Sequence, residues 1–189
     1  MSHSKSALLV IDVQQSFLHR PYFSDHDLPA FQNHLLALIG ACQAAEIPVV
    51  TVLHLEPSGA FAKASGWVKP MAFLPTLPGP VFEKTVHNAL LGSGLHEYLQ
   101  RQGITHLIIS GIRTEQCCET TARVASDLGY VVDFVTEATL TFAMQHPNGR
   151  IYSAAEIKER TELVLNERFA RICSVEQVLE QLSAETIKV

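Results

Sequence analysis

The sequence predicts an α/β protein with a mostly parallel sheet and helices on both faces, in the three-layer doubly wound (Rossmann-like) arrangement. Short apolar runs such as 7–11 and 105–110 have the length and character of strands buried on both faces. Longer segments with apolar residues at helical spacing alternate with these runs along the chain. Because connections between parallel strands are right-handed crossovers, this alternation predicts a sheet covered on two sides.

The first three elements precede a long loop. Residues 7–11 are a continuous apolar run that ends at Asp12, and they are expected to form a buried strand. Residues 28–45 carry leucine, isoleucine and cysteine at helical spacing, and 47–53 are a second apolar run, which predicts a helix and a strand. Residues 57–80 then hold five of the nine prolines and the only tryptophan, Trp67, so we expect a functional loop or a packed surface loop.

The middle of the chain repeats the alternation. Residues 81–83 are a short strand candidate, and 94–101 are a helix candidate that Ser93 could cap. Residues 105–110 are a strong strand candidate. Residues 114–128 are expected to form a helix, because Gly129 stands where glycine commonly ends one.

The last elements have weaker signals. Residues 130–135 are an apolar strand candidate. Ser153 and Glu156 form a capping box, which predicts a helix continuing through Leu165. A short strand near 170–173 and a terminal helix at 175–182 complete the pattern.

Composition limits the possible partners and the compartment. The chain has 189 residues, 47% of them hydrophobic, which suits a single domain spanning 1–189. Its 14 basic residues against 19 acidic ones, with no basic run, argue against nucleic-acid or membrane partners. No apolar stretch approaches the roughly 20 residues needed to span a bilayer, and the first residues do not resemble a secretory signal. The four cysteines, two adjacent and two far away, suit neither a disulfide framework nor a zinc site, so we expect a cytoplasmic protein.

Three reactive residues stand at or after the predicted strand ends. Asp12 ends the first strand, Lys84 follows 81–83, and Cys117 lies in the first turn of the helix after 105–110. Because the active crevice of an open α/β sheet lies outside the carboxyl ends of its strands, these groups are expected to converge. Each of them alone also has an ordinary structural explanation, as a capping carboxylate, a surface lysine or a buried thiol.

Cys117 is the most informative of the three. A thiol near a helix N-terminus and a lysine is expected to have a lowered pKa, because both favour the thiolate. Cys118 is expected to face elsewhere, since consecutive helical residues point about 100° apart. A redox pair formed by the two thiols is the minor alternative.

Other sites are not indicated. The sequence contains no dinucleotide fingerprint, Walker loop or nucleophile elbow, and we expect no cofactor. The nine histidines show no metal-binding grouping, so no metal site is expected. His54 and His87 alone are expected near the crevice, as pocket or core residues.

Three motifs together resemble the isochorismatase-like cysteine hydrolase superfamily. They are a D-x-Q-x-x-F element comprising Asp12, Gln14 and Phe17, then Lys84, then a G-x-x-T-x-x-C-x-x-x-T-A element from Gly111 to Ala122. They occur in the family's order and near its spacing, and the resemblance covers nearly the whole chain.

The resemblance implies a catalytic triad of Asp12, Lys84 and Cys117. In this hypothesis Asp12 accepts the thiol proton, Cys117 attacks an amide-type carbonyl, and Lys84 orients Asp12 and holds the thiolate. The resemblance also implies a non-proline cis peptide at Ile112-Arg113. The backbone N–H groups of Arg113 and Cys117 would then face the oxyanion. A thioester acyl-enzyme and its hydrolysis by water would complete the cycle.

Departures from the family narrow the substrate. The metal-binding Asp-x-His pair of nicotinamidase-like members is absent from the segment His54-Leu-Glu-Pro57, which disfavours nicotinamidase activity. True isochorismate hydrolases usually lack the cysteine, which disfavours vinyl-ether hydrolysis. A small amide, ureido or carbamoyl compound remains. Arg113 could pair with a substrate carboxylate, or instead lie at the surface or a subunit interface. The residues expected to contact substrate are Gln14, Phe17, Phe61, Trp67, His87, Arg113 and Thr114.

Two alternative functions also remain compatible with the sequence. The chain could be a thiol redox protein using Cys117 and Cys118, or a catalytically silent binding or assembly module on the same fold. Because members of the family often form dimers or tetramers, the resemblance also implies a homo-oligomer, with 57–80 lining a pocket or an interface.

Overall fold

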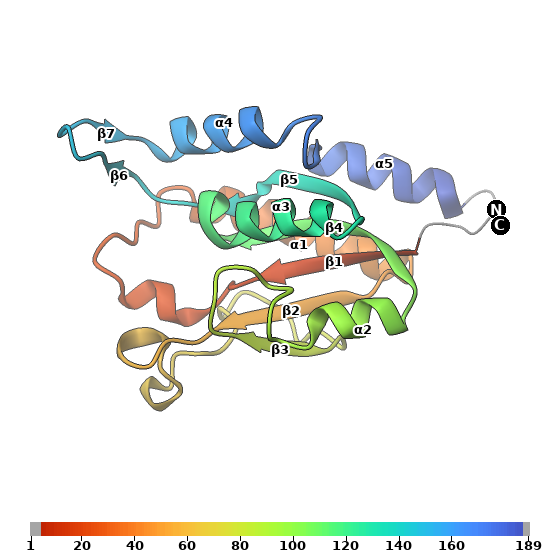
Figure 1. Cartoon of the computed structure of the whole chain (residues 1–189), viewed down its shortest axis with the longest axis horizontal. Helices are drawn as coiled ribbons and strands as arrows, with labels where there is room; N and C mark the ends of the chain where they lie inside the picture. The colour runs from red at the N-terminus through yellow and green to blue at the C-terminus, as the bar shows by residue number, and fades with distance from the viewer. Residues whose placement is uncertain (1–4, 187–189) are drawn as a thin grey trace.

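A six-stranded parallel sheet forms the centre of the protein, in a computed structural model that describes residues 5–186 (Figure 1). The strand order is β3-β2-β1-β4-β5-β8. The strands are β1 (Lys5–Ile11), β2 (Val49–His54), β3 (Val81–Lys84), β4 (Ile104–Ile112), β5 (Val131–Leu140) and β8 (Arg171–Ile172). This sheet with its helices confirms the predicted fold class.

Helices cover both faces of the sheet. Helices α1 (Leu28–Ala44) and α5 (Val175–Thr186) pack on one face, and α2 (Leu95–Arg101) and α3 (Glu119–Asp127) pack on the other. Helix α4 (Ala154–Leu165) lies against α3, and its Leu165 packs into the hydrophobic core on the face that α2 and α3 cover. Successive residues of β1 alternate between the two cores, Leu8 in the first and Leu9 in the second, and both are fully buried. This double burial explains why β1 is apolar throughout its second half.

The structure differs from the sequence-based prediction at three places in the second half of the chain. Residues 114–128 are not one α-helix: a π-helical turn, η4 (Thr114–Cys118), precedes α3. Strand β5 continues to Leu140 instead of ending at 135, because an irregularity in its pairing with β4 lets it resume beside Gly111 and Ile112. A small antiparallel hairpin, β6 (Met144–Gln145) and β7 (Ile151–Tyr152), was not predicted; it extends away from the sheet (Figure 1).

The loop at 57–80 is packed against the carboxyl end of β1. It contains two 3₁₀ turns, η2 (Gly59–Phe61) and η3 (Lys63–Ser65). Further along, Gln15 N–H donates to Lys69 O at 2.9 Å, and Met71 N–H donates to Val13 O at 3.0 Å. The loop is therefore tied to the segment that follows Asp12.

Strands β1 and β4 approach each other unusually closely beside Asp12. A Cβ atom on Gly111 would lie 2.0 Å from the carbonyl oxygen of Ile11, and Gly111 has φ +130°. Only glycine fits there, because a side chain would collide with backbone that cannot rotate away. Asp12 itself has φ +54°, in the left-handed region that aspartate tolerates better than most residues. The close approach places Asp12 beside the segment that carries Cys117.

Candidate active site

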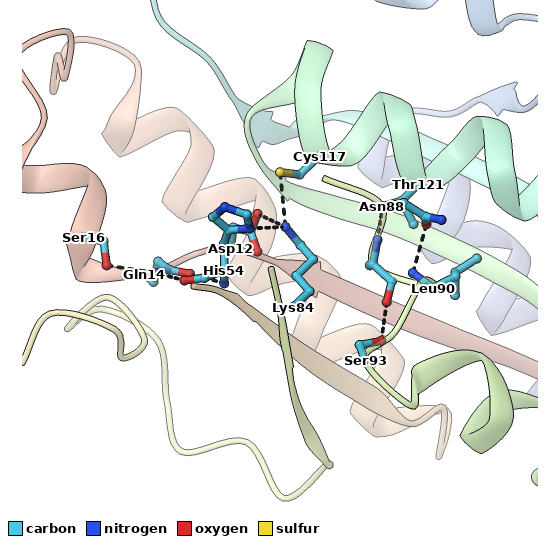
Figure 2. A network of polar contacts seen from close by, with 11 residues as sticks. Asp12, Gln14, Ser16, His54, Lys84, Asn88, Leu90, Ser93, Cys117 and Thr121 are labelled. Carbon is cyan, nitrogen blue, oxygen red and sulfur yellow. Dashed lines mark hydrogen bonds and ion pairs between the residues drawn. The ribbon is translucent and has the colours of Figure 1, made fainter. Parts of the chain in front are cut away.

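Lys84 connects the three predicted catalytic residues. Its Nζ lies 2.8 Å from Asp12 Oδ2 and 3.3 Å from Cys117 Sγ (Figure 2). Asp12 follows β1 and Lys84 ends β3, and β2 lies between these strands, so the long lysine side chain reaches past the end of β2. Cys117 comes from η4, directly after β4. The structure thus brings together the carboxyl ends of strands that are far apart in the sequence.

The three side chains of this cluster are almost completely buried from solvent. Asp12 is fully buried, and Lys84 and Cys117 are 2% and 6% exposed. Burial raises the pKa of the Asp12 carboxyl, and the nearby Lys84 charge lowers it by less. Burial alone would lower the pKa of Lys84, but its interactions with Asp12 and Cys117 together outweigh burial and raise that pKa. Lys84 is therefore held as an ammonium.

The Cys117 thiol does not have the lowered pKa that its place in the sequence suggested. Burial raises its pKa well above the ordinary value, and the Asp12 charge raises it further, while Lys84 lowers it by less. A helix terminus and one cation are outweighed because the sulfur lies away from water. The resting nucleophile is a thiol that needs a base. The buried Asp12 carboxyl lies within hydrogen-bonding reach of the Cys117 thiol, so it is placed to accept that proton.

Gln14 fixes the end of β2 and does not open toward a cavity. Its side chain accepts from His54 N–H at 2.7 Å and donates to His54 O at 3.1 Å and to Ser16 Oγ at 2.9 Å. The Ser16 hydroxyl in turn donates to Trp67 O. Because Gln14 is fully buried and both its amide atoms are bonded within the protein, its observed contacts position His54.

The aromatic residues expected to contact substrate occupy different environments. Phe17 and Phe61 are buried and meet edge to face, with ring centroids 5.0 Å apart. Trp67 is partly exposed and stacks on His19, 4.0 Å away. His87 is exposed, and its ring lies 6.1 Å from that of His54. His87 therefore lies beside His54, whose ring Nδ1 is 3.1 Å from Lys84 Nζ.

Thr114 and Arg113 have buried side chains with partners inside the protein. The Thr114 hydroxyl bonds to that of Thr139 at 2.8 Å. The Arg113 guanidinium lies 3.0 Å from Glu115 Oε1 and 4.9 Å from the ring centre of Tyr22. Arg113 is therefore not the outward-facing residue considered from the sequence. The Ile112-Arg113 peptide is cis, as the resemblance implied.

The segment after Lys84 is fastened to α3, four residues beyond Cys117. Ala89 N–H donates to Thr121 Oγ1 at 3.0 Å, and the Ser93 hydroxyl donates to Ala89 O at 2.6 Å. Sequence reasoning missed Ala89 and Ser93 as site supports, because neither belongs to a recognised motif. These bonds hold the Lys84 and Cys117 segments in register.

The residues present do not form the metal site of nicotinamidase-like proteins. His54 Nδ1 lies 3.1 Å from the Lys84 ammonium, and Glu56 lies 3.7 Å from Arg20. Within residues 5–186, no group of three or more potential ligands comes together around a metal position. Two hollows of about 830 and 400 Å³ border His34 on α1, on residues separate from the Lys84 cluster.

Comparison with known proteins places this geometry in a family. The isochorismatase domain model matches residues 6–185. The chain is 27% identical to the isochorismatase family protein YrdC of Bacillus subtilis (strain 168), covering 93% of this chain and 95% of that one. It is 33% identical to nicotinamidase 3 of Arabidopsis thaliana, covering 72% and 74% of the two chains.

A solved structure agrees. An isochorismatase-family protein from Chromobacterium violaceum ATCC 12472 superimposes with a TM-score of 0.88 at 26% identity, covering 97% of this chain and 96% of that one. Streptothricin hydrolase of Streptomyces noursei is 31% identical over 72% of this chain, which spans half of that protein. The domain match, these relatives and the shared fold show that the chain belongs to the isochorismatase family of hydrolases.

Proposed function

We propose that the protein is a cysteine-dependent hydrolase of a small amide, ureido or carbamoyl compound, acting through a thioester acyl-enzyme. The observation that carries the proposal is the position of the Lys84 ammonium, 2.8 Å from the Asp12 carboxylate and 3.3 Å from the Cys117 sulfur, with all three residues buried. An amidase reaction also agrees with the names of two relatives, a nicotinamidase and a ureidoacrylate amidohydrolase.

The first half of the reaction forms the acyl-enzyme. Asp12 takes the proton of the Cys117 thiol, which lies within hydrogen-bonding reach of its carboxyl, and the sulfur attacks the substrate carbonyl carbon. The backbone N–H groups of Arg113 and Cys117 stabilise the oxyanion. When the C–N bond breaks, Asp12 returns the proton to the leaving nitrogen, and ammonia or an amine departs. Lys84 stays charged throughout and faces the negative charge as it moves from Asp12 to sulfur.

The second half regenerates the thiol. Asp12 removes a proton from water, the resulting hydroxide attacks the thioester carbonyl, and the C–S bond breaks. The proton then returns to the Cys117 sulfur, and the carboxylic or carbamic acid leaves. No metal, cofactor or oxidant enters this cycle. The reaction uses one water for each C–N bond broken.

The test is ammonia release from a panel of primary amides, ureido acids and carbamoyl amino acids. We expect Cys117→Ala to lose turnover while keeping the circular dichroism spectrum and melting temperature of the wild type. Cys173→Ala, which removes another buried thiol, serves as the matched control and keeps turnover. Turnover that survives in Cys117→Ala would reject the thioester mechanism.

The expected assembly and compartment form part of the same proposal. A homo-oligomer, a dimer or tetramer, could use the β6–β7 hairpin, where Met144 and Ile151 are exposed apolar side chains. Light scattering coupled to gel filtration measures the oligomeric state.

None of the helices within residues 5–186 has both the length and the apolar character needed to cross a membrane. A reducing compartment such as the cytoplasm suits a mechanism that depends on a free thiol.

A further inference from the structure

The Lys84 ammonium has three acceptors and three protons. Besides Asp12 Oδ2 at 2.8 Å and Cys117 Sγ at 3.3 Å, the third acceptor is His54 Nδ1 at 3.1 Å (Figure 2). A lysine ammonium has three N–H donors and accepts nothing. With all three donors engaged, rotation of the ammonium about its Cε–Nζ bond would break all three contacts. The direction of the N–H toward sulfur therefore depends on the other two acceptors.

The contact with Lys84 determines the tautomer of His54. Because the ammonium can only donate, His54 Nδ1 must carry a lone pair, so the ring proton is on Nε2. The ring also hydrogen-bonds to the backbone of Val86, a contact that favours a protonated ring nitrogen and agrees with this tautomer. Burial, followed by the charge of Lys84, lowers the pKa of His54 to about 4, so the ring is neutral at neutral pH.

His54 is also held in place from its backbone. It is the last residue of β2, and Gln14 bonds to both its N–H and its C=O. On the ring side, Phe61 packs edge on, with centroids 5.8 Å apart. A neutral imidazole fixed by strand, amide clamp and aromatic contact is a rigid acceptor.

We infer that His54 is a positioning residue whose Nδ1 accepts one Lys84 proton and thereby keeps another directed at the Cys117 sulfur. This inference rests on the proposed function, since it assigns His54 to the same site. His54 does not touch the reacting carbonyl or exchange a proton; it acts through Lys84. The net charge of the cluster stays zero when the negative charge moves from Asp12 to sulfur, because His54 is neutral in both states.

Two substitutions separate this role from a general packing role. His54→Asn places an amide oxygen near the position of Nδ1 and keeps an acceptor, whereas His54→Leu keeps apolar bulk and removes it. The readout is the rate at which iodoacetamide alkylates Cys117, followed by peptide mass spectrometry across the neutral and alkaline range. His96→Leu is the matched control, because His96 bonds to Tyr130 Oη at 3.0 Å on α2 and has no part in the cluster.

We expect His54→Leu to slow alkylation of Cys117 roughly tenfold or more at neutral pH and to move its pH midpoint upward, because a lost hydrogen bond to a charged group weakens the hold on the thiolate. His54→Asn should restore most of the rate, and His96→Leu should match the wild type. If His54→Leu does not fold, His54→Val is the second acceptor-free variant, since valine suits a strand end.

The outcomes distinguish the two proposals. A wild-type Cys117 that reacts, together with a His54→Leu rate and midpoint equal to the wild type, would overturn the role of His54 and leave the hydrolase proposal standing. An Asn variant as slow as the Leu variant would also overturn it. Ammonia release that survives in Cys117→Ala would reject the thioester hydrolase proposal, and the role of His54 with it.

Discussion

The Asp12 carboxylate and the Lys84 ammonium form an ion pair at 2.8 Å, with both side chains at most 1% exposed. The partners are 72 positions apart in the chain and come from the ends of strands that are not neighbours in the sheet. A buried pair of this kind is costly to break, because the remaining charge would have no partner. The Lys84 charge opposes the rise in the Asp12 pKa that burial causes, and so favours the ionised form that can act as a base.

The acid limb of kcat/KM should reflect Asp12. Its pKa is raised by burial, so as the pH falls the carboxylate gains its proton earlier than an ordinary aspartate, whose pKa is about 4. Because only the ionised form can take the thiol proton, activity should be lost with a midpoint above about 4. A pH series on a substrate identified by ammonia release measures this midpoint. A limb at or below the ordinary value would contradict the assignment of Asp12 as the base.

Gly111→Ala should disable the protein, whereas Gly103→Ala should not. The new Cβ at 111 would lie 2.0 Å from Ile11 O, so β1 and β4 would have to separate beside Asp12. Gly103 also has a positive φ, +66°, but no atom within 4 Å of the added carbon. We expect a loss of about 1 kcal/mol for Gly103→Ala and a much larger loss for Gly111→Ala. Urea unfolding of both variants is the measurement, and equal losses would refute the role of the close approach.

Asp133 should stabilise the fold in a pH-dependent way. It receives two hydrogen bonds from Arg171, at 2.8 and 2.7 Å, and lies 2.9 Å from His106 Nε2. Although burial acts to raise its pKa, bonds from His106 and Arg171 lower it to about 2. The folded state therefore binds this proton less readily than the unfolded chain, and the stabilisation is present above about pH 4 and lost as the pH falls toward 2.

Asp133→Asn tests this contribution. At neutral pH the free energy of unfolding should fall by about 2 kcal/mol, the typical scale of hydrogen bonds to a charged group. The difference from the wild type should shrink in acid as the native carboxyl gains its proton. Asp127→Asn, at an exposed position on α3, is the control and should change little. A difference that stays constant from neutral to acidic pH would count against the charged network.

Cys118→Ala should leave the reactivity of Cys117 intact. Cys118 is fully buried in the core beneath α2 and α3, and burial raises its pKa well above the ordinary value. Loss of the sulfur should cost about 1 kcal/mol of stability through a small cavity. Peptide mass spectrometry after peroxide treatment of the wild type should find no 117–118 disulfide. Finding that disulfide in folded protein would favour the redox reading instead.

The convergence of Asp12, Lys84 and Cys117 could be expected because each residue stands at or just after the end of an apolar run. The order of strands could not be predicted from these runs, and it is the order that makes His54 a neighbour of Lys84. The sequence placed His54 near the crevice as a pocket or core residue, but its contact with Lys84 follows from the strand order, in which His54 ends the strand between those of Asp12 and Lys84.

Three other features of the structure could not be predicted from local sequence patterns. The π-helical turn at 114–118 was missed because its residues suit an ordinary helix equally well. The β6–β7 hairpin was missed because its strands have two residues each, too short for alternation to be recognised. The pKa of Cys117 was predicted in the wrong direction because burial, which the sequence shows only indirectly, outweighs the charges nearby.

The four neighbouring strands β3, β2, β1 and β4 each supply one group in a single row: Lys84, His54, Asp12 and, just beyond β4, Cys117. The spacing of this row is set by parallel backbone pairing inside the sheet. The four groups are thus spaced by a scaffold of main-chain hydrogen bonds, and not by the loops that connect the strands.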